Sequence, residues 1–288
     1  MIGPKFKNLY PFKSNYFTTK DGHQLHYVDE GKGPVIIMVH GNPTWSFYYR
    51  NLIKELRQNY RVIAPDHIGC GFSDKPQNFD YCLKNHVDNL KDLIRHLGVE
   101  HFSLIVHDWG GAIGFGLATA RPNDVDKVVI LNTAAFTDNN IPWRINICKF
   151  PVLGEQLIRR FNGFAWPATF MAVKGKMDEE VKEGYLAPYD NYHNRIATAR
   201  FVKDIPMRST HPSFQTLKNI EEKLPLVKGK KLILWGEKDF CFNMHFYNRW
   251  REIYPEAASE VYGKAGHYVL EDATKETTQR VQRFFAGE

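Results

Sequence analysis

The chain has 288 residues, of which 43% are hydrophobic and 24% are charged, a composition typical of an ordinary globular protein. Its formal net charge of +6 comes from lysines and arginines interspersed with acids, and its longest apolar run, VIIMV, is too short to cross a bilayer. The sequence therefore predicts neither a nucleic-acid-binding protein nor a membrane-spanning one.

The sequence shows neither a targeting segment nor a metal-binding motif. The first 17 residues, MIGPKFKNLYPFKSNYF, contain aromatic residues and lysines but no apolar core, so we expect no signal peptide. The four cysteines lie far apart and match no metal-binding spacing: Cys70, Cys82, Cys148 and Cys241. We therefore expect free thiols, no bound metal and a cytoplasmic protein.

The predicted elements begin with a hairpin and continue with short apolar strands. Residues 15–22 end in the turn signal Asp21-Gly22, and a second run follows at residues 24–31. This pattern favours a hairpin of two antiparallel strands. The later runs are apolar on both faces, as in buried parallel strands: PVIIMVHG (34–41), YRVIAPD (60–66), FSLIVHD (102–108), DKVVILNT (126–133), KKLILWGEKD (230–239) and, more weakly, SEVYGKAGH (259–267). Helical patterns at 85–98 and 110–122 lie between them, so the sequence predicts a mostly parallel, doubly wound α/β sheet.

One interval between predicted strands is much longer than the others. Almost a hundred residues separate Thr133 from Lys230, and many of them are Trp, Phe, Tyr and Pro in short helical patterns. We predict an inserted helical cap at residues 136–213 and a core formed by residues 1–135 and 214–288. Such a cap would cover the carboxyl ends of the strands, where open α/β sheets bind their ligands.

The pentapeptide HDWGG at residues 107–111 joins a predicted strand to a predicted helix. It matches the nucleophile elbow Gly-x-Ser-x-Gly, a tight turn that lifts its central side chain above the sheet. Here Asp108 replaces the serine and His107 replaces the first glycine. In the alternative interpretation, Asp108 is the N-cap of the helix. The pentapeptide alone leaves both interpretations open.

Candidate partners of Asp108 follow other predicted strands. Asn42 begins the loop after MVHG, and its backbone N–H together with that of Trp109 would form an oxyanion hole. Asp239 follows one late strand, and His267 follows the last one. The order nucleophile, acid, histidine is that of the α/β-hydrolases, so we predict Asp108, Asp239 and His267 as catalytic residues.

The motifs HGNPTWSFYYR, APDHIGCGFSDKP, HDWGG and AGHYVLED make the chain similar to the haloalkane dehalogenase family over nearly its whole length. The resemblance implies the α/β-hydrolase fold and no cofactor. It implies that Asp108 is the nucleophile, His267 the base and Asp239 the supporting acid. It also implies that the side chains of Asn42 and Trp109 bind the leaving halide.

The position of the acid narrows this resemblance to one subgroup. Some family members carry the acid after the strand that here reads VVILN, where this chain has Asn132, which cannot ionise. Asp239 is therefore the expected acid, and the combination resembles the third dehalogenase subgroup. That subgroup is similar to the β-lactone decarboxylases of bacterial long-chain olefin synthesis, which the stretches LAPYDNYHNRIATARFVKDIP and WGEKDFCF also resemble.

A carboxylate nucleophile suits attack on an sp3 carbon that carries a leaving group. With an unperturbed pKa of about 3.9, an aspartate is already ionised at neutral pH, whereas a serine must first lose a proton. The attack would form an ester of Asp108, which water activated by His267 would hydrolyse while Asp239 orients the imidazole. The Trp109 indole and the Asn42 amide are neutral N–H donors suited to a departing halide.

The leading hypothesis is a haloalkane dehalogenase-like hydrolase with a small apolar halogenated substrate. The alternatives are a β-lactone decarboxylase with the same residues, an epoxide hydrolase, and a non-catalytic binding protein on the same fold. An epoxide hydrolase needs phenolic donors from the cap, for which Tyr185, Tyr189 and Tyr192 are candidates. A fluoroacetate dehalogenase would be expected to have Asp-Arg in place of Asp108-Trp109. A homo-oligomer or a complex with a pathway enzyme is also compatible with the sequence.

Other polar and aromatic residues are expected to have structural roles. We expect Asp66 to order the loop APDHIGCGFSD, and His40 and His107 to support strand ends rather than bind a metal. The aromatic residues of the cap are expected mainly to pack the cap, with some of them lining an apolar pocket: Phe161, Phe164, Trp166, Phe170, Tyr185, Tyr189 and Tyr192.

Overall fold

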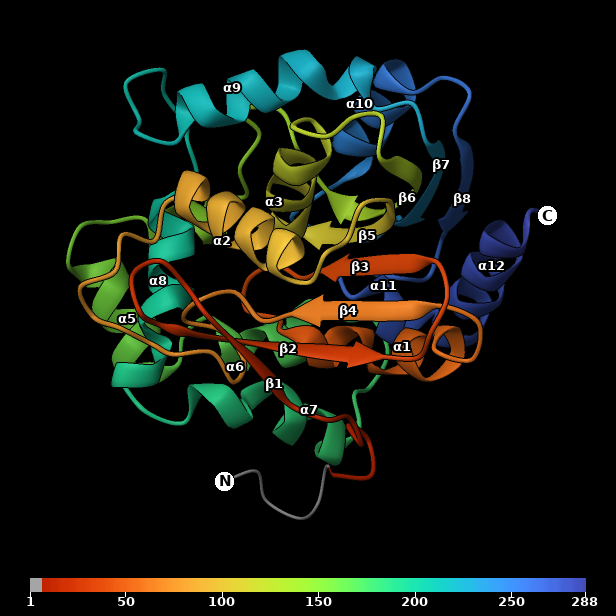
Figure 1. Ribbon diagram of the computed structural model, residues 1–288. Coiled ribbons are helices and arrows are strands. Elements are labelled where there is room, and N and C mark those ends of the chain that lie inside the picture. The colour runs from red at the N-terminus through yellow and green to blue at the C-terminus, as the bar shows by residue number, and fades with distance from the viewer. Residues whose placement is uncertain (1–6) are drawn as a thin grey trace.

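An eight-stranded sheet forms the centre of the molecule, with its strands in the order β1-β2-β4-β3-β5-β6-β7-β8 (Figure 1). The computed structural model describes residues 7–288. The expectation of no signal peptide concerns residues 1–17, and residues 1–6 of that segment lie outside the described residues. The strands are β1 (Asn15–Thr18), β2 (Gln24–Glu30), β3 (Val35–Val39), β4 (Arg61–Pro65), β5 (Phe102–Asp108), β6 (Val125–Thr133), β7 (Lys230–Gly236) and β8 (Ala258–Tyr262).

The pairing of the strands confirms the predicted sheet. Strand β2 pairs antiparallel with both β1 and β4, and the β1–β2 pair is the hairpin expected around Asp21-Gly22. The pairs β3–β4, β3–β5, β5–β6, β6–β7 and β7–β8 are parallel. The carboxyl ends of β3, β5, β6, β7 and β8 therefore lie along one edge of the sheet, where the predicted site residues follow them.

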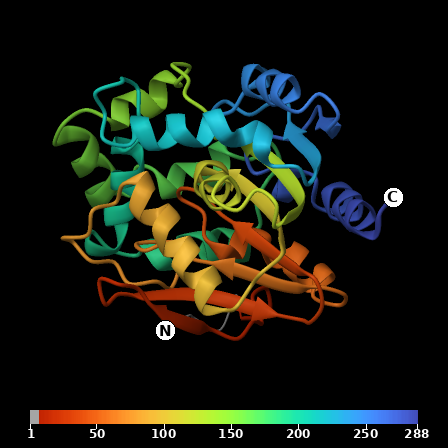
Figure 2. The same ribbon diagram turned by 45° about the horizontal axis from the view of Figure 1, so that its top comes forward.

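The core helices lie in two layers, one on each face of the sheet (Figures 1 and 2). One layer consists of α2 (Leu83–His96), α3 (Trp109–Ala118), α9 (Phe214–Lys223) and α10 (Met244–Ile253). The other consists of α1 (Arg50–Leu56), α11 (Val269–Asp272) and α12 (Thr274–Ala286). Four short 3₁₀ turns connect elements: η2 (Ser46–Tyr49), η3 (Ala187–Tyr189), η4 (His193–Arg195) and η5 (Leu224–Leu226).

The central strands are apolar throughout because both of their faces are buried. In β3, Ile37 packs into the cluster around α2 and α3, whereas its neighbour Ile36 packs into the cluster around α1 and α12. Neither face can then accept a run of polar residues, as in other parallel sheets covered by helices. The weaker run at 259–267 forms only the short edge strand β8, whose exposed residues include Glu260.

A helical insertion separates β6 from β7. Its helices are α4 (Trp143–Cys148), α5 (Leu153–Phe161), α6 (Ala165–Met171), α7 (Glu179–Leu186) and α8 (Ile196–Lys203). Helices α4, α5 and α8 share a small apolar cluster of their own, formed by Cys148, Ile158, Ala199 and Val202. In Figure 1, α5, α6 and α8 lie together at one side of the sheet. Helix α9, by contrast, packs on α2 and α3 of the core.

The described residues give three further findings. All four cysteines are free, as the sequence predicted: Cys70, Cys82, Cys148 and Cys241. Among residues 7–288, three or more His, Cys, Asp or Glu side chains do not gather anywhere in a way that could hold a metal ion. Over the same range, none of the helices combines the length and the apolar character needed to cross a bilayer.

Candidate active site

The chain turns sharply between β5 and α3, and Asp108 lies at the tip of this turn. Asp108 has φ +52° and ψ −128°, a conformation that residues other than glycine rarely adopt. The turn brings α3 so close to β3 that a Cβ atom on Gly110 would lie 1.9 Å from the Val39 carbonyl oxygen. Although Asp108 stands at the N-cap position, its side chain makes no capping hydrogen bond. The geometry therefore favours a nucleophile elbow over a helix cap.

Three strand ends bring the predicted triad together. His267 Nδ1 lies 2.8 Å from Asp239 Oδ2, and His267 Nε2 lies 3.6 Å from Asp108 Oδ2. The imidazole thus stands between two carboxylates, one from the loop after β7 and one from the turn after β5. All three residues are nearly buried, with exposed fractions between 3% and 8%. This arrangement allows the imidazole to exchange a proton near Asp108 while Asp239 fixes its orientation.

Burial and neighbouring charges act in opposite directions on the ionisation of His267 and Asp108. Burial disfavours the imidazolium, but the charges and hydrogen bonds of Asp239 and Asp108 outweigh it and raise the pKa of His267 to about 10. Burial also disfavours the ionised form of Asp108, yet His267 and the Asn42 N–H hold the pKa of this carboxyl below its usual value. At neutral pH the site therefore contains the Asp108 carboxylate beside an imidazolium.

Asn132 supports the acid, a role that the sequence analysis missed. Its Nδ2 donates to Asp239 Oδ2 at 3.0 Å and to the Gly236 carbonyl at 3.1 Å, and its Oδ1 accepts from the Gly236 N–H at 2.8 Å. The Cys241 N–H donates to the other oxygen of Asp239 at 2.6 Å. The amide after β6 thus orients the carboxylate after β7. The sequence feature that could have indicated this supporting role is the uncharged Asn132 itself, at the position where some related enzymes carry the acid.

Asn42 and Trp109 both line the cavity next to Asp108. The backbone N–H of Asn42 donates to Asp108 Oδ1 at 2.6 Å, where it would stabilise an oxyanion formed on an Asp108 ester. The side-chain amide of Asn42 donates to the Thr198 carbonyl at 3.1 Å. An amide has two N–H groups, so one remains for a ligand. The described hydrogen bonds include none from the Trp109 backbone to Asp108, and this second oxyanion donor stays a prediction.

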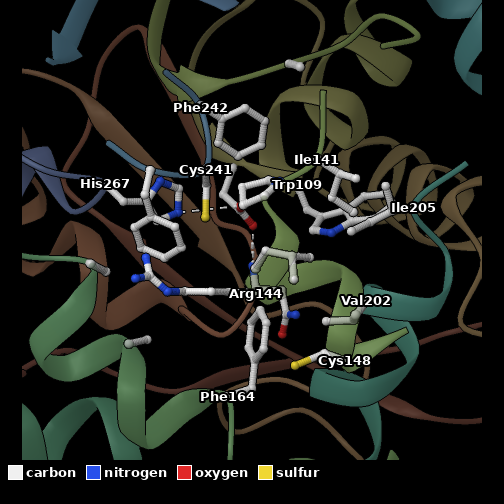
Figure 3. A pocket seen from close by; sticks show the side chains of 18 of the residues that line it. Trp109, Ile141, Arg144, Cys148, Phe164, Val202, Ile205, Cys241, Phe242 and His267 are labelled. Carbon is white, nitrogen blue, oxygen red and sulfur yellow. Dashed lines mark hydrogen bonds and ion pairs between the residues drawn. The ribbon is translucent and has the colours of Figure 1, made fainter. Parts of the chain in front are cut away.

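The site opens into a cavity of about 480 Å³ between the core and the inserted helices. Most of its lining is apolar, and Figure 3 shows the side chains of Ile141, Phe164, Val202, Ile205 and Phe242 around it. The titratable residues of the lining, apart from cysteine and tyrosine, are Asp108, Asp138, Arg144 and His267. A cavity of this size and character suits an alkyl substrate with its reacting carbon at Asp108.

The aromatic lining comes mostly from residues that the sequence analysis did not single out. Of the cap aromatics named there, only Phe164 lines the cavity. The other aromatic residues of the lining are Phe136, Trp143, Phe240, Phe242, Phe246 and Tyr268, with Trp109 beside Asp108. The remaining cap aromatics are either exposed or buried elsewhere: Phe161, Trp166, Phe170, Tyr185, Tyr189 and Tyr192.

The three cap tyrosines lie outside the cavity lining. Tyr185 donates its hydroxyl to Glu271, which also accepts two hydrogen bonds, of 2.6 and 2.8 Å, from the Arg50 guanidinium. Tyr189 is completely buried, and Tyr192 is 41% exposed. The epoxide-hydrolase hypothesis therefore loses the phenolic donors on which it depended.

The polar residues assigned structural roles have them. Asp66 accepts hydrogen bonds from the His26 imidazole, from the Phe72 N–H of its own loop and from the Ser46 N–H at the start of η2. His40 Nδ1 donates to the carbonyl of the next residue at 2.7 Å. His107 Nε2 donates to the carbonyl of His267 at 2.9 Å, and this bond ties the end of β5 to the loop after β8.

Comparison with known proteins identifies the family and the fold of the chain. Residues 34–274 match the alpha/beta hydrolase fold family. The chain is 44% identical over 284 residues to a cis-3-alkyl-4-alkyloxetan-2-one decarboxylase of Shewanella oneidensis, across 96% of this chain and 89% of that protein. It is 32% identical over 270 residues to haloalkane dehalogenase 2 of Mycobacterium bovis, across 92% of each. A crystal structure of a haloalkane dehalogenase from Bradyrhizobium elkani superposes with a TM-score of 0.89 at 25% identity, across 96% of this chain and 98% of that one.

These matches extend over most of the chain and confirm both the expected fold and the resemblance seen in the motifs. The similarity reaches both groups that the sequence analysis named, and it is greater to the decarboxylase than to haloalkane dehalogenase 2. The chain belongs to the α/β-hydrolase family, as a haloalkane dehalogenase-like member that is also related to the cis-3-alkyl-4-alkyloxetan-2-one decarboxylases.

Proposed function

We propose that Asp108 attacks an sp3 carbon of an apolar substrate and forms a covalent ester. The turn at Asp108 presents the carboxylate to the cavity, and the Asn42 N–H holds Oδ1 while Oδ2 faces His267. The lowered pKa keeps this carboxyl ionised, as a nucleophile requires. The leaving anion would be held by the Asn42 amide and the Trp109 indole, which line the same cavity.

Where the ester is hydrolysed, as after cleavage of a carbon–halogen bond, we propose that His267 changes its protonation state. The pKa of His267 is about 10 because two carboxylates flank it. Ester formation removes the charge of Asp108, so the pKa of His267 falls and the imidazolium can release its proton. The neutral imidazole, oriented by Asp239, can then activate a water molecule for attack on the ester carbonyl.

The substrate that we propose is a β-lactone with two alkyl chains, an oxetan-2-one. The observation that carries this proposal is the 44% identity to the Shewanella decarboxylase, whose name specifies such a substrate, over nearly the full length of both proteins. Haloalkane dehalogenase 2 is less similar, at 32% identity. The apolar lining of the cavity supports a substrate with alkyl chains.

The proposed lactone reaction uses the same residues in two steps. Asp108 Oδ2 attacks the sp3 ring carbon that is bonded to the ring oxygen, and the bond between these two ring atoms breaks with its electron pair on the leaving carboxylate. The bond between the carboxylate carbon and its neighbour then breaks, and its electron pair forms the C=C bond. The ester bond to Asp108 breaks in the same step and returns its electron pair to the Asp108 carboxylate. The products are an alkene and carbon dioxide, and no water is consumed.

Cleavage of a carbon–halogen bond is the second candidate function. The observation that favours it is the pair of neutral donors at the cavity, the Asn42 amide and the Trp109 indole. The high structural similarity to a haloalkane dehalogenase supports it further. In this reaction the halide leaves with the electron pair of the C–X bond, and water activated by His267 releases an alcohol from Asp108.

Substrate specificity of the wild-type protein tests the choice between a β-lactone and a haloalkane as substrate. We would measure kcat/KM for a series of bromoalkanes by bromide release, and for a long-chain cis-β-lactone by alkene formation. We expect a preference of about a hundredfold or more for the lactone, equivalent to about 2.7 kcal/mol of transition-state binding. Brisk bromide release without lactone turnover would instead make the carbon–halogen bond the substrate, with Asp108 still as nucleophile.

Removing either leaving-group donor is expected to impair both reactions. We expect Asn42→Ala and Trp109→Phe each to lower kcat/KM by about 10²- to 10³-fold, because each loses an N–H that stabilises the departing halide or carboxylate. Steady-state kinetics with a bromoalkane and the lactone would measure the losses. Phe201→Leu is a matched control, because Phe201 packs against Trp109 without donating a hydrogen bond. Full activity of both donor variants would contradict this role.

We also propose that residues 136–213 act as a cap on a core of residues 1–135 and 214–288. The insertion supplies much of the cavity lining, including Trp143, Phe164 and Val202, while the triad comes from loops of the core.

We also propose that the protein is located in the cytoplasm. Free thiols at all four cysteines, of which Cys148 and Cys241 line the cavity, support a reducing compartment.

A further inference from the structure

Helix α5 exposes an apolar stripe to solvent. Leu153, Leu157 and Phe161 follow one another at intervals of four residues, so they lie on one side of the helix. Their exposed fractions are 70%, 38% and 74%. An adjacent side of the helix contributes Ile158 to the small cluster shared with α4 and α8. The stripe is therefore largely exposed instead of being packed against α4 and α8.

The neighbouring helix α4 continues this apolar surface. Trp143 and Ile147, again four residues apart, are 67% and 41% exposed. In the turn between the helices, Phe150 and Val152 are 57% and 73% exposed. We call the following seven residues the α4–α5 face: Trp143, Ile147, Phe150, Val152, Leu153, Leu157 and Phe161. Exposed apolar residues gathered in this way mark a site of interaction rather than an ordinary surface.

The α4–α5 face is continuous with the cavity of the site. Trp143, Ile147 and Leu157 belong to the face and also line the cavity. Arg144 lies between the two as well: it lines the cavity, and its guanidinium lies 5.2 Å from the centre of the Trp143 ring. A binding partner that covers the α4–α5 face would therefore lie at an entrance to the cavity.

The charge around this face is positive. Residues 139–161, which include the α4–α5 face, contain four lysines and arginines and a single acid, Glu155. Glu155 is neutralised within the fold, because it accepts hydrogen bonds from both Arg159 and Lys203. Arg144 and Arg160 are exposed directly beside the apolar residues Trp143 and Phe161. The partner of this surface must therefore be both apolar in part and negatively charged.

We propose that the α4–α5 face docks the protein on the surface of a bilayer that contains anionic phospholipid, with the cavity entrance toward the lipid. Tryptophan, phenylalanine and leucine side chains can enter the boundary between headgroups and acyl chains, while flanking arginines bind the anionic headgroups. Attachment of this kind needs no membrane-spanning helix. The proposal is independent of the reaction, because lactones and haloalkanes with alkyl chains both partition into lipid and would reach Asp108 through the same entrance.

A second copy of the chain would be a poorer partner for this surface. In a twofold dimer the same patch meets itself, so Arg144 and Arg160 of one copy would approach the same arginines of the other. Like charges at an interface are unfavourable, whereas an anionic lipid surface neutralises them. The charge of the face therefore selects a bilayer over self-association.

Flotation with lipid vesicles tests the proposal. We expect the wild-type protein to float with vesicles of phosphatidylcholine and phosphatidylglycerol in equal parts, not with phosphatidylcholine alone, and to be released by high salt. The triple variant Phe150→Ser, Leu153→Ser, Phe161→Ser should reduce the bound fraction by about tenfold or more, because three apolar anchors are lost. None of these three residues lines the cavity, so activity on a short water-soluble substrate should be unchanged.

A matched control places the same change elsewhere on the surface. Tyr16 and Leu226 are each 52% exposed and lie outside the insertion, so Tyr16→Ser, Leu226→Ser should float like the wild type. Equal binding by the triple variant and the wild type, or no binding of the wild type to the anionic vesicles, would overturn the proposal. Light scattering that shows a wild-type dimer, and a monomeric triple variant, would overturn it in favour of a second copy of the chain.

Discussion

Asp108→Ala is expected to abolish turnover of both candidate substrates while the fold is retained. No other side chain at the elbow can form the ester, so we expect kcat to fall by about 10⁴-fold or more, within the range seen when other enzymes lose a nucleophile. The change removes one partner of the buried His267 imidazolium, but Asp239 remains paired with it, so the fold is expected to persist. Steady-state kinetics and a thermal unfolding curve would measure the two effects.

A second measurement on the same variant does not depend on activity. Because the Asp108 carboxylate helps to raise the pKa of His267 to about 10, Asp108→Ala should lower this pKa, which an NMR titration of the imidazole would report. Asp108→Asn is the matched control. It also removes the negative charge, but its amide oxygen can still accept the hydrogen bond from the Asn42 N–H. Activity within about a hundredfold of the wild type, in a preparation free of wild-type protein, would place the nucleophile elsewhere.

His267→Gln is expected to separate the two candidate reactions. With a bromoalkane, alkylation of Asp108 needs no base, but hydrolysis of the ester does, so the covalent intermediate should accumulate. Intact mass spectrometry should show the added alkyl group, and peptide mapping should place it on Asp108. With a β-lactone, the ester is released by loss of carbon dioxide rather than by water. We therefore expect no stalled intermediate, and alkene formation slowed by about 10²-fold because the positive charge of the imidazolium beside Asp108 is lost.

Asp239→Asn serves as the control for this experiment. It keeps the imidazole but weakens its orientation and the support of its charged form, because Asp239 lies 2.8 Å from His267 Nδ1. Turnover should be slower with either substrate, with no alkyl-enzyme that persists after the substrate is exhausted. A His267→Gln protein that turns over bromoalkanes at the wild-type rate would contradict the role of His267 as base.

Much of the architecture could be predicted because its signals are local. Strands such as β3 and β7 are short runs that are apolar on both faces, and this pattern is specific to strands covered on both sides. The elbow at Asp108 is likewise encoded in a few residues, since the small Gly110 permits the close approach of α3 to β3. The position of the insertion followed from the long interval after Thr133.

The positions of Asp108, Asp239 and His267 were also predictable, for a topological reason. Parallel strands end at the same edge of a sheet, so residues that follow several such strands are brought together without any detail of packing. The structure places them as expected, with His267 between the two carboxylates. The role of Asn132 was not predictable, because its hydrogen bond to Asp239 depends on the exact approach of two loops.

The sequence by itself thus determined the sheet, the helical segment between β6 and β7 and the positions of the candidate triad at strand ends, because periodicity and turn motifs act over a few residues. The tertiary structure alone decided how the inserted helices are oriented. Tyr185 donates a hydrogen bond to Glu271, the ion-pair partner of Arg50, whereas Phe164 lines the cavity and Phe161 faces solvent. Short amphipathic helices can pack in several orientations, and only their contacts with residues far along the chain select one of them.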